Sequence, residues 1–183
     1  DKKLVVDFCF SYEEKIAKYG GLDIQILGIG RTGHIGFNEP GSSSQSITRL
    51  VNLDSITRMD AASDFFGEEN VPIKAITMGI GTIMKARRII IMAWGEIKSG
   101  VVAQAIENLP SDNIPASYLQ FHPNTSFILD TAAGSDLCRI KTPWALGVID
   151  WNPELTKRAV IWLCDKLTKP ILKLTARDYG DHG

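Results

Sequence analysis

The sequence predicts an α/β fold with an open, mostly parallel sheet and helices on both of its faces. Apolar segments of strand length alternate along the chain with segments of helical periodicity, which is the pattern of a parallel sheet. Three apolar segments end at glycines, at Gly28–Gly30, Gly79–Gly81 and Gly95. Ligands bind beyond the carboxyl ends of the strands in such sheets, so we expect binding residues directly after these glycines.

The composition is typical of a globular protein and argues against nucleic-acid and membrane partners. The chain has 183 residues, of which 44% are hydrophobic and 22% are charged, and its formal net charge is −1. This balance gives no bulk attraction for nucleic acid or an anionic membrane, and no apolar run approaches the ~18 residues of a membrane span. The scattered Cys9, Cys138 and Cys164 are interpreted as free thiols of a cytoplasmic protein.

Helix and strand signals follow one another in the first part of the chain. Residues 11–21 are predicted to form a short helix, with Ser11 as its N-cap and Gly20 just after its end. Residues 22–30 follow as an apolar strand that stops at glycines. A helix followed by an apolar strand is typical of a parallel α/β sheet.

Further strand signals occupy the middle of the chain. Residues 46–53 are β-like, and Asp54 is a candidate N-cap for a helix over residues 55–66. Residues 74–81 are a second apolar segment, which ends in Gly-x-Gly. Residues 87–95 are β-branched and almost continuously apolar, which predicts a central strand that is covered on both faces.

The last part of the chain alternates in the same way. Residues 96–109 predict a helix with an apolar stripe of Ile97, Val101, Ala105 and Leu109. Residues 125–130 are the last predicted strand. Residues 152–169 predict an amphipathic helix, for which Asn152 is a suitable N-cap and Pro153 a suitable first residue.

The segment RTGHIGFNEPGSS, residues 31–43, directly follows the first glycine-marked strand end. His34 can transfer a proton near neutral pH, and a carboxylate beside an imidazole fixes its tautomer and stabilises the imidazolium. Glu39 can reach His34 if the chain turns between them, which Asn38 and Pro40 favour. This pair indicates acid–base chemistry on a small polar substrate. The alternative is a loop histidine bonded to backbone, with a solvated Glu39.

Two cations are candidates for anion binding. Lys98 lies in the first turn of the helix predicted over residues 96–109, where a cation opposes the helix dipole. A nearby anion would explain this placement, and a solvated surface lysine is the alternative. Arg49 either pairs with a phosphate or a carboxylate, or is an exposed cation on a strand.

The residues LGIGRTGHIGFNEPGSS, 27–43, resemble the signature of the glucosamine-6-phosphate deaminase (isomerase) family. The similarity extends over roughly residues 11–141. It implies that residues 1–141 are the C-terminal part of a domain with a sugar-phosphate isomerase/deaminase-like fold. Residues 142–183 are then expected to be a C-terminal extension that packs on this domain or links it to a further region.

The resemblance also implies a reaction and a set of site residues. Members of the family convert glucosamine 6-phosphate and water to fructose 6-phosphate and ammonia, and need neither a metal nor an organic cofactor. His34 matches the histidine that assists ring opening, Glu39 matches its carboxylate partner, and Lys98 matches a lysine that contacts the substrate phosphate. The resemblance also places Gly30, Thr32 and Gly33 at substrate-binding positions. Ser42, Ser43 and Arg49 match allosteric positions at subunit contacts of homo-oligomers.

Several positions depart from the family pattern. Thr32 stands where the family usually has an aspartate, no arginine lies near Ser63–Asp64 where one contacts the phosphate, and Val51 replaces a basic residue of the allosteric region. The family's glycine-rich phosphate loop and the aspartate that moves a proton between C2 and C1 have no match before Tyr12. We therefore expect an N-terminally incomplete domain that does not turn over substrate by itself.

Three functional hypotheses remain open at this point. The leading one is a deaminase/isomerase domain that binds a small amino-sugar phosphate. The alternatives are a catalytically impaired sugar-phosphate-binding or regulatory domain, and a related enzyme that acts on another sugar phosphate or a lactone. The presence of both His34 and Glu39 favours an enzyme, because a binding domain has little need of the pair.

Overall fold

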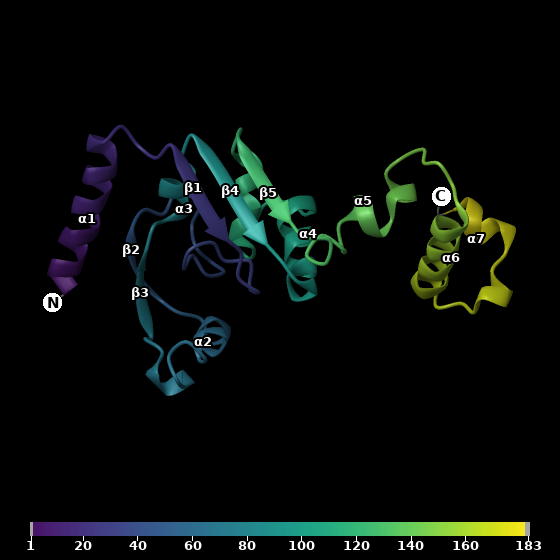
Figure 1. Cartoon of the computed structure of the whole chain (residues 1–183), viewed down its shortest axis with the longest axis horizontal. Helices are drawn as coiled ribbons and strands as arrows, with labels where there is room; N and C mark the ends of the chain where they lie inside the picture. Colours follow the sequence, from purple (N-terminus) through teal and green to yellow (C-terminus); the bar gives the residue numbers. More distant parts are fainter. Residues whose placement is uncertain (1, 182–183) are drawn as a thin grey trace. The chain divides into compact units, whose positions relative to one another are not determined.

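The computed structural model describes residues 2–181, and the chain divides between Ser135 and Asp136 into two compact units. The first unit contains the described strands together with helices α1 to α4, and the second contains helices α5 to α7 (Figure 1). Each unit has its own buried side chains.

A three-stranded parallel sheet forms the centre of the first unit. β4 (Arg88–Ala93) lies between β1 (Ile24–Gly28) and β5 (Thr125–Leu129) and pairs in parallel with both (Figure 1). Ile89 and Ile91 of β4 are fully buried. The predicted α/β class is confirmed, as is the central place of the β-branched strand, because continuous apolar character suits a strand with a neighbour on each side.

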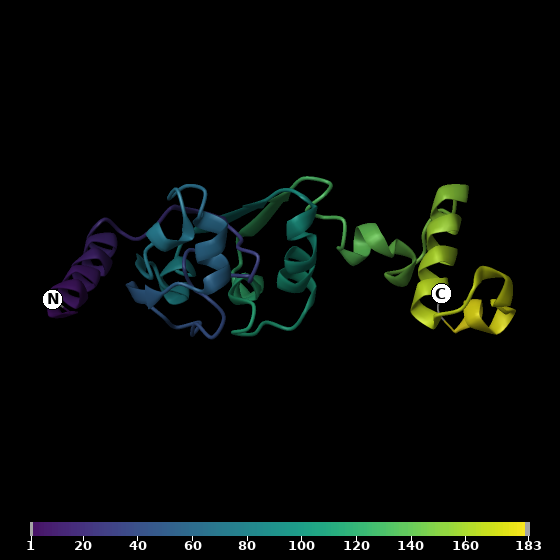
Figure 2. The ribbon, with the colours of Figure 1, turned by 90° about the horizontal axis from the view of Figure 1, so that it is seen from below.

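The two faces of this sheet differ in burial. Ile89 and Ile91 face the core together with the buried side of α4 (Ser99–Glu107), which lies alongside the sheet (Figure 2). Side chains two residues apart in a strand share a face, and their register partners in the neighbouring strands point the same way. Ile24, Ile26 and Ile128 therefore lie on the opposite face and are exposed by 55%, 59% and 52%.

The strand signals at residues 46–53 and 74–81 form a separate pair. β2 (Arg49–Asn52) and β3 (Lys74–Thr77) are antiparallel to each other and do not join the parallel sheet. The expectation that all the apolar segments build one sheet is wrong here. A parallel return needs a long crossover that packs back along the sheet, whereas the only α-helix between these two strands, α2 (Ser55–Ala61), has seven residues.

The first helix is longer than the sequence predicts. α1 runs over Lys2–Lys18, so the prediction of a short helix that begins at Ser11 is wrong. Ser11 Oγ donates to the carbonyl of Phe8, 2.8 Å away, and is therefore a mid-helix hydroxyl that bonds back to the preceding turn. Gly20 follows the end of the helix with a φ of +83°, as predicted.

For the other helices, the sequence predicted where a helix begins more accurately than where it ends. Asp54 caps α2 by accepting from the Ile56 amide at 2.8 Å, but α2 ends at Ala61 rather than at residue 66. Residues 96–98 are a 3₁₀ turn before α4. The predicted apolar stripe is correct for Val101 and Ala105, which are buried in α4. It is wrong for Ile97 and Leu109, which are exposed and lie outside α4.

The second unit is helical and centred on tryptophans. It comprises α5 (Cys138–Lys141), α6 (Pro153–Leu167) and α7 (Ala176–Gly180). As predicted, Asn152 caps α6 through a 2.9 Å bond from the Leu155 amide.

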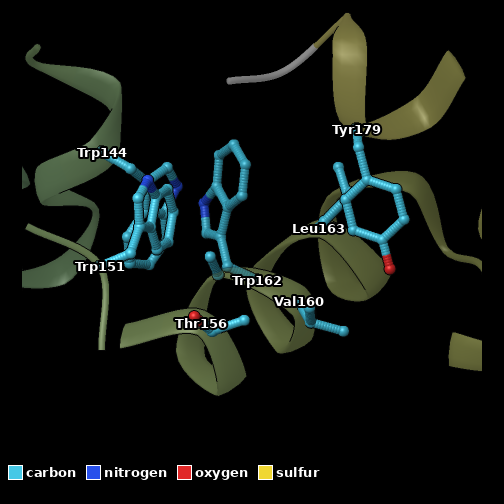
Figure 3. A pocket seen from close by; sticks show the side chains of 8 residues that line it. Trp144, Trp151, Thr156, Val160, Trp162, Leu163 and Tyr179 are labelled. Atoms are coloured by element: carbon cyan, nitrogen blue, oxygen red, sulfur yellow. The ribbon is translucent and has the colours of Figure 1, made fainter. Parts of the chain in front are cut away.

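Its core contains the buried indole of Trp144. The ring of Trp144 stacks on Trp151 at a centroid distance of 6.2 Å and meets the edge of Trp162 at 5.9 Å (Figure 3). These rings and Tyr179 line a cavity of about 200 Å³. Stacked and edge-to-face aromatic pairs of this kind stabilise small cores.

Two features considered from the sequence are the state of the cysteines and the presence of a membrane-spanning helix. Cys9, Cys138 and Cys164 form no disulfide within residues 2–181, and Cys9 is buried. Across residues 2–181, no helix combines the length and the apolar character that a bilayer crossing requires.

Candidate active site

The loop that follows β1 folds tightly around His34. The Gly33 amide donates to the carbonyl of Gly30 and the Gly30 amide donates to the carbonyl of His34, both at 3.0 Å. Gly33 has a φ of +80°, which L side chains rarely adopt. The imidazole lies against Gly30 so closely that a Cβ there would be 2.1 Å from His34 Cε1. The glycines named from the sequence therefore permit the placement of the imidazole.

His34 and Glu39 are brought together as the turn propensities indicate. The Asn38 amide donates to the carbonyl of Ile35 at 3.1 Å, which turns the chain back and sets His34 Nδ1 3.1 Å from Glu39 Oε2. The side chains of the pair are 16% and 13% exposed. The pair is therefore largely desolvated but accessible from one side.

Because Glu39 is an acceptor, its contact favours a proton on Nδ1 of the neutral imidazole. Nε2 then carries the lone pair. No hydrogen-bond partner for Nε2 is found within residues 2–181. His34 also lines an open cleft of about 430 Å³ beyond the end of β1. This is the arrangement that a general base needs: one nitrogen held by a carboxylate and the other available to a ligand.

Lys98 reaches the same cleft from the 3₁₀ turn before α4. Its Nζ donates to the carbonyl of Ile29 at 2.9 Å. Burial lowers the pKa of Lys98, the nearby Asp60 opposes this, and Arg31 adds to it. The structure thus brings Lys98 and His34 to one cleft, where a partly buried cation can meet an anionic group of a ligand.

Sequence reasoning missed the contribution of α2 to this cleft. Thr57, Asp60 and Ala61 of α2 line it, together with Asp64, which follows the end of the helix. Asp60 also holds Arg31 in a two-point ion pair, with Arg31 Nε 2.9 Å from Oδ2 and Nη2 2.5 Å from Oδ1. The hydrogen bond to Asp60 raises the pKa of Arg31. The signal was present for the helical members, because Thr57, Asp60 and Ala61 have the i, i+3, i+4 spacing of one helical face.

Comparisons with known proteins identify the family. The model for glucosamine-6-phosphate isomerases/6-phosphogluconolactonase matches residues 5–127.

The chain belongs to this family.

Two curated relatives and one solved structure resemble the chain closely. A putative glucosamine-6-phosphate deaminase-like protein of Bacteroides thetaiotaomicron is 46% identical over 182 residues, which cover 100% of this chain and 28% of that protein. A glucosamine-6-phosphate deaminase of Corynebacterium urealyticum is 50% identical over 126 residues, or 69% of this chain and 49% of the relative. The structure of a monomeric glucosamine-6-phosphate deaminase is 43% identical and matches with a TM-score of 0.68, over 70% of this chain and 53% of that chain.

The chain therefore spans about half the length of two of these deaminases and a smaller share of the Bacteroides protein. The relatives named as deaminases belong to an enzyme family of carbohydrate metabolism.

The expected allosteric residues of this family member are only partly brought together. Arg49 Nη1 donates to Asn38 Oδ1 at 2.8 Å, and Arg49 Nη2 donates to Ser42 Oγ at 3.1 Å. Burial lowers the pKa of Arg49. The exposed Ser43 instead accepts from the amide of Gln45 at 3.2 Å. Regulation through these residues, like the formation of a homo-oligomer, stays a prediction.

Asn38 has a structural role that the sequence did not indicate. Its side chain is fully buried, and Nδ2 donates to the carbonyls of Ile35 and Met78, each at 2.8 Å. With the bond from Arg49, the amide joins the loop of residues 31–43 to the end of β3 and to β2. A buried amide satisfied in this way fixes the turn that carries Glu39.

Proposed function

We propose that the His34–Glu39 pair opens the sugar ring in the conversion of glucosamine 6-phosphate and water to fructose 6-phosphate and ammonia. The observation that supports this most strongly is the 3.1 Å contact between His34 Nδ1 and Glu39 Oε2 at the wall of a cleft that Lys98 also lines. The chain belongs to a family that includes glucosamine-6-phosphate deaminases. The geometry is suited to acid–base catalysis on a phosphorylated sugar.

Ring opening moves one proton from the anomeric hydroxyl to the ring oxygen as the bond between C1 and that oxygen breaks. In the proposal, His34 Nε2 accepts the proton from the hydroxyl and returns it to the ring oxygen. Glu39 stabilises the imidazolium that exists between these two transfers. Lys98 holds the phosphate, which keeps the anomeric carbon near His34.

For these 183 residues the proposal covers binding and ring opening. The shift from aldose to ketose needs a further base between C2 and C1, and the aspartate that the family resemblance assigns to that step has no match in the sequence. Release of ammonia by the chain alone is therefore not expected. This limits the most direct test to the step that His34 performs.

The test measures exchange between the α and β anomers of glucosamine 6-phosphate, because anomer exchange proceeds through the open-chain sugar. Two-dimensional NMR exchange spectroscopy with the chain added is expected to show faster exchange than in buffer. His34→Gln is expected to slow the catalysed exchange by about 10²–10⁴-fold, the usual range for loss of a general acid–base. Glucosamine without the phosphate is the matched ligand control, and its exchange is expected to be accelerated less.

Equal acceleration by the wild type and by His34→Gln would show that His34 is not the base. One observation favours a second function, a sugar-phosphate-binding domain without catalysis. Thr32 Oγ1 lies 3.0 Å from His34 Nδ1, at the position where the resemblance expects an aspartate, and a hydroxyl supplies no negative charge to stabilise an imidazolium. Binding of glucosamine 6-phosphate without any acceleration of anomer exchange is the result that this second function requires.

A further inference from the structure

Thr57 places a buried hydroxyl at the His34–Glu39 pair, although it lies outside the sequence motif. It belongs to α2 and is only 7% exposed. Its Oγ1 donates to Glu39 Oε1 at 2.7 Å and lies 3.3 Å from His34 Nδ1. The hydroxyl therefore contacts both members of the pair and is shielded from water.

The hydroxyl groups around His34 donate their protons to Glu39. Thr32 Oγ1 donates to Oε2 at 3.2 Å, and Thr57 Oγ1 donates to Oε1 at 2.7 Å. Each hydroxyl has one proton, and a carboxylate is a stronger acceptor than a neutral imidazole nitrogen. Both threonine oxygens therefore present lone pairs toward Nδ1, at 3.0 Å for Thr32 and 3.3 Å for Thr57.

Three acceptor oxygens thus surround Nδ1, and no donor faces it within the described part of the chain. If Nδ1 were unprotonated, its lone pair would oppose the negative oxygen of Glu39 at 3.1 Å. The proton must therefore lie on Nδ1, which leaves Nε2 as the acceptor.

We propose that Thr57 is a positioning residue that selects this tautomer of His34 by orienting Glu39. The role in catalysis rests on the proposed ring opening, but the effect on the tautomer does not.

The place of Thr57 in α2 makes this orientation rigid. Asp54 caps the helix through the Ile56 amide, and the amide of Asp54 itself lies 3.4 Å from Glu39 Oε1. One oxygen of Glu39 is thus held by the start of α2, and the other is held by Thr32 in the loop of residues 31–43. Removing the Thr57 hydroxyl leaves Oε1 with only the long contact to the Asp54 amide, so the carboxylate can rotate away from Nδ1.

The test reads the tautomer directly from the ¹⁵N chemical shifts of the imidazole nitrogens at a pH at which the ring is neutral. The chain has three histidines, so His34→Gln assigns the His34 signals. The wild type is expected to show Nδ1–H alone. Thr57→Val, which keeps the shape and removes the hydroxyl, is expected to show a measurable Nε2–H fraction. Thr57→Ser, which keeps the hydroxyl, is expected to restore the wild-type spectrum.

Thr82→Val is the matched control. Thr82 is equally buried, at 2% exposed, and also donates to a carboxylate at 2.7 Å, but this carboxylate belongs to Glu13 and not to the pair. Its loss is expected to leave the His34 tautomer unchanged. If Thr57→Val does not fold, Thr57→Ala is measured instead, because it removes the same hydroxyl without branching at Cβ.

Two results would overturn the inference: a hydroxyl-free variant at position 57 that keeps the wild-type tautomer, or a Thr82→Val chain that shows the same tautomer change. Anomer exchange gives a second readout. Thr57→Val is expected to lower the exchange rate of glucosamine 6-phosphate by about 10- to 100-fold. If the wild type shows no accelerated exchange while the tautomer still depends on Thr57, the proposed function fails and the positioning role stands.

Discussion

The substitution Gly30→Ala would place a methyl group inside the imidazole ring of His34. An added Cβ would lie 2.1 Å from Cε1, 2.3 Å from Nε2 and 2.4 Å from Nδ1. Ordinary contacts between carbon atoms are ~3.5–4.0 Å, so the ring must move by about 1.5 Å or more. Gly30 does not occupy the left-handed region of φ, so the effect is a steric displacement of His34 and not a strained backbone.

A movement of this size breaks the contact between His34 Nδ1 and Glu39 Oε2, which is 3.1 Å at present. Misplacing a catalytic group by about 1 Å can lower a rate by about 10²-fold. We therefore expect Gly30→Ala to slow anomer exchange of glucosamine 6-phosphate by about 10²-fold or more. Overpacking typically destabilises a fold by ~1–3 kcal/mol. Thermal unfolding will measure this loss of stability separately from the loss of rate.

Gly28→Ala is the matched control for the position of the ring. A Cβ at Gly28 meets no atom within 4 Å, so the His34 ring resonances are expected to remain where they are in the wild type. In Gly30→Ala the same resonances are expected to move. A Gly30→Ala chain that is folded and exchanges anomers at the wild-type rate would refute the argument, because the imidazole would then have no need of its present position.

Two further predictions concern stability. Burial opposes a low pKa for Glu13, but hydrogen bonds from Thr48 and Thr82 lower it overall. Glu13→Gln is therefore expected to reduce the free energy of unfolding by about 1 kcal/mol in urea at pH 7. A variant as stable as the wild type would show that α1 does not depend on this anchor. In the second unit, the hydrogen bond from Lys169, followed by those from Thr175, lowers the pKa of Asp178 from 3.8 to about 2. Its stabilising effect is thus complete above about pH 4 and is lost as the pH falls through 2. The difference in Tm between the wild type and Asp178→Asn should be present at pH 6 and absent near pH 2, and a difference independent of pH would contradict the assignment.

Much of the fold follows from local patterns in the sequence. The β-branched run of β4 predicts a central strand because such a strand has no polar face to present to water. Asp54 and Asn152 begin their helices because a short polar side chain can satisfy a free amide in the first turn. The start of α1 was predicted wrongly, because the sequence does not distinguish a serine inside a helix from a serine at its N-cap. Ser11 lies inside α1.

The candidate site also has a part that the local sequence predicts and a part that it does not. The segment around His34 and Glu39 could be read from its residues, since the turn that joins the two is local and favoured by Asn38 and Pro40. Thr57 could not be read from them. It lies 18 residues beyond Glu39, in α2 between β2 and β3, and meets the carboxylate only in the folded chain.

The sequence by itself therefore determined the α/β class, the central strand and the loop that carries the His34–Glu39 pair. These depend on periodicity, capping and turn propensity between near neighbours. Only the tertiary structure decided which face of α2 meets the pair, how Lys98 reaches the same cleft from the 3₁₀ turn before α4, and which oxygens surround Nδ1 of His34. Each of these depends on contacts between segments far apart in the chain, which local propensities do not specify.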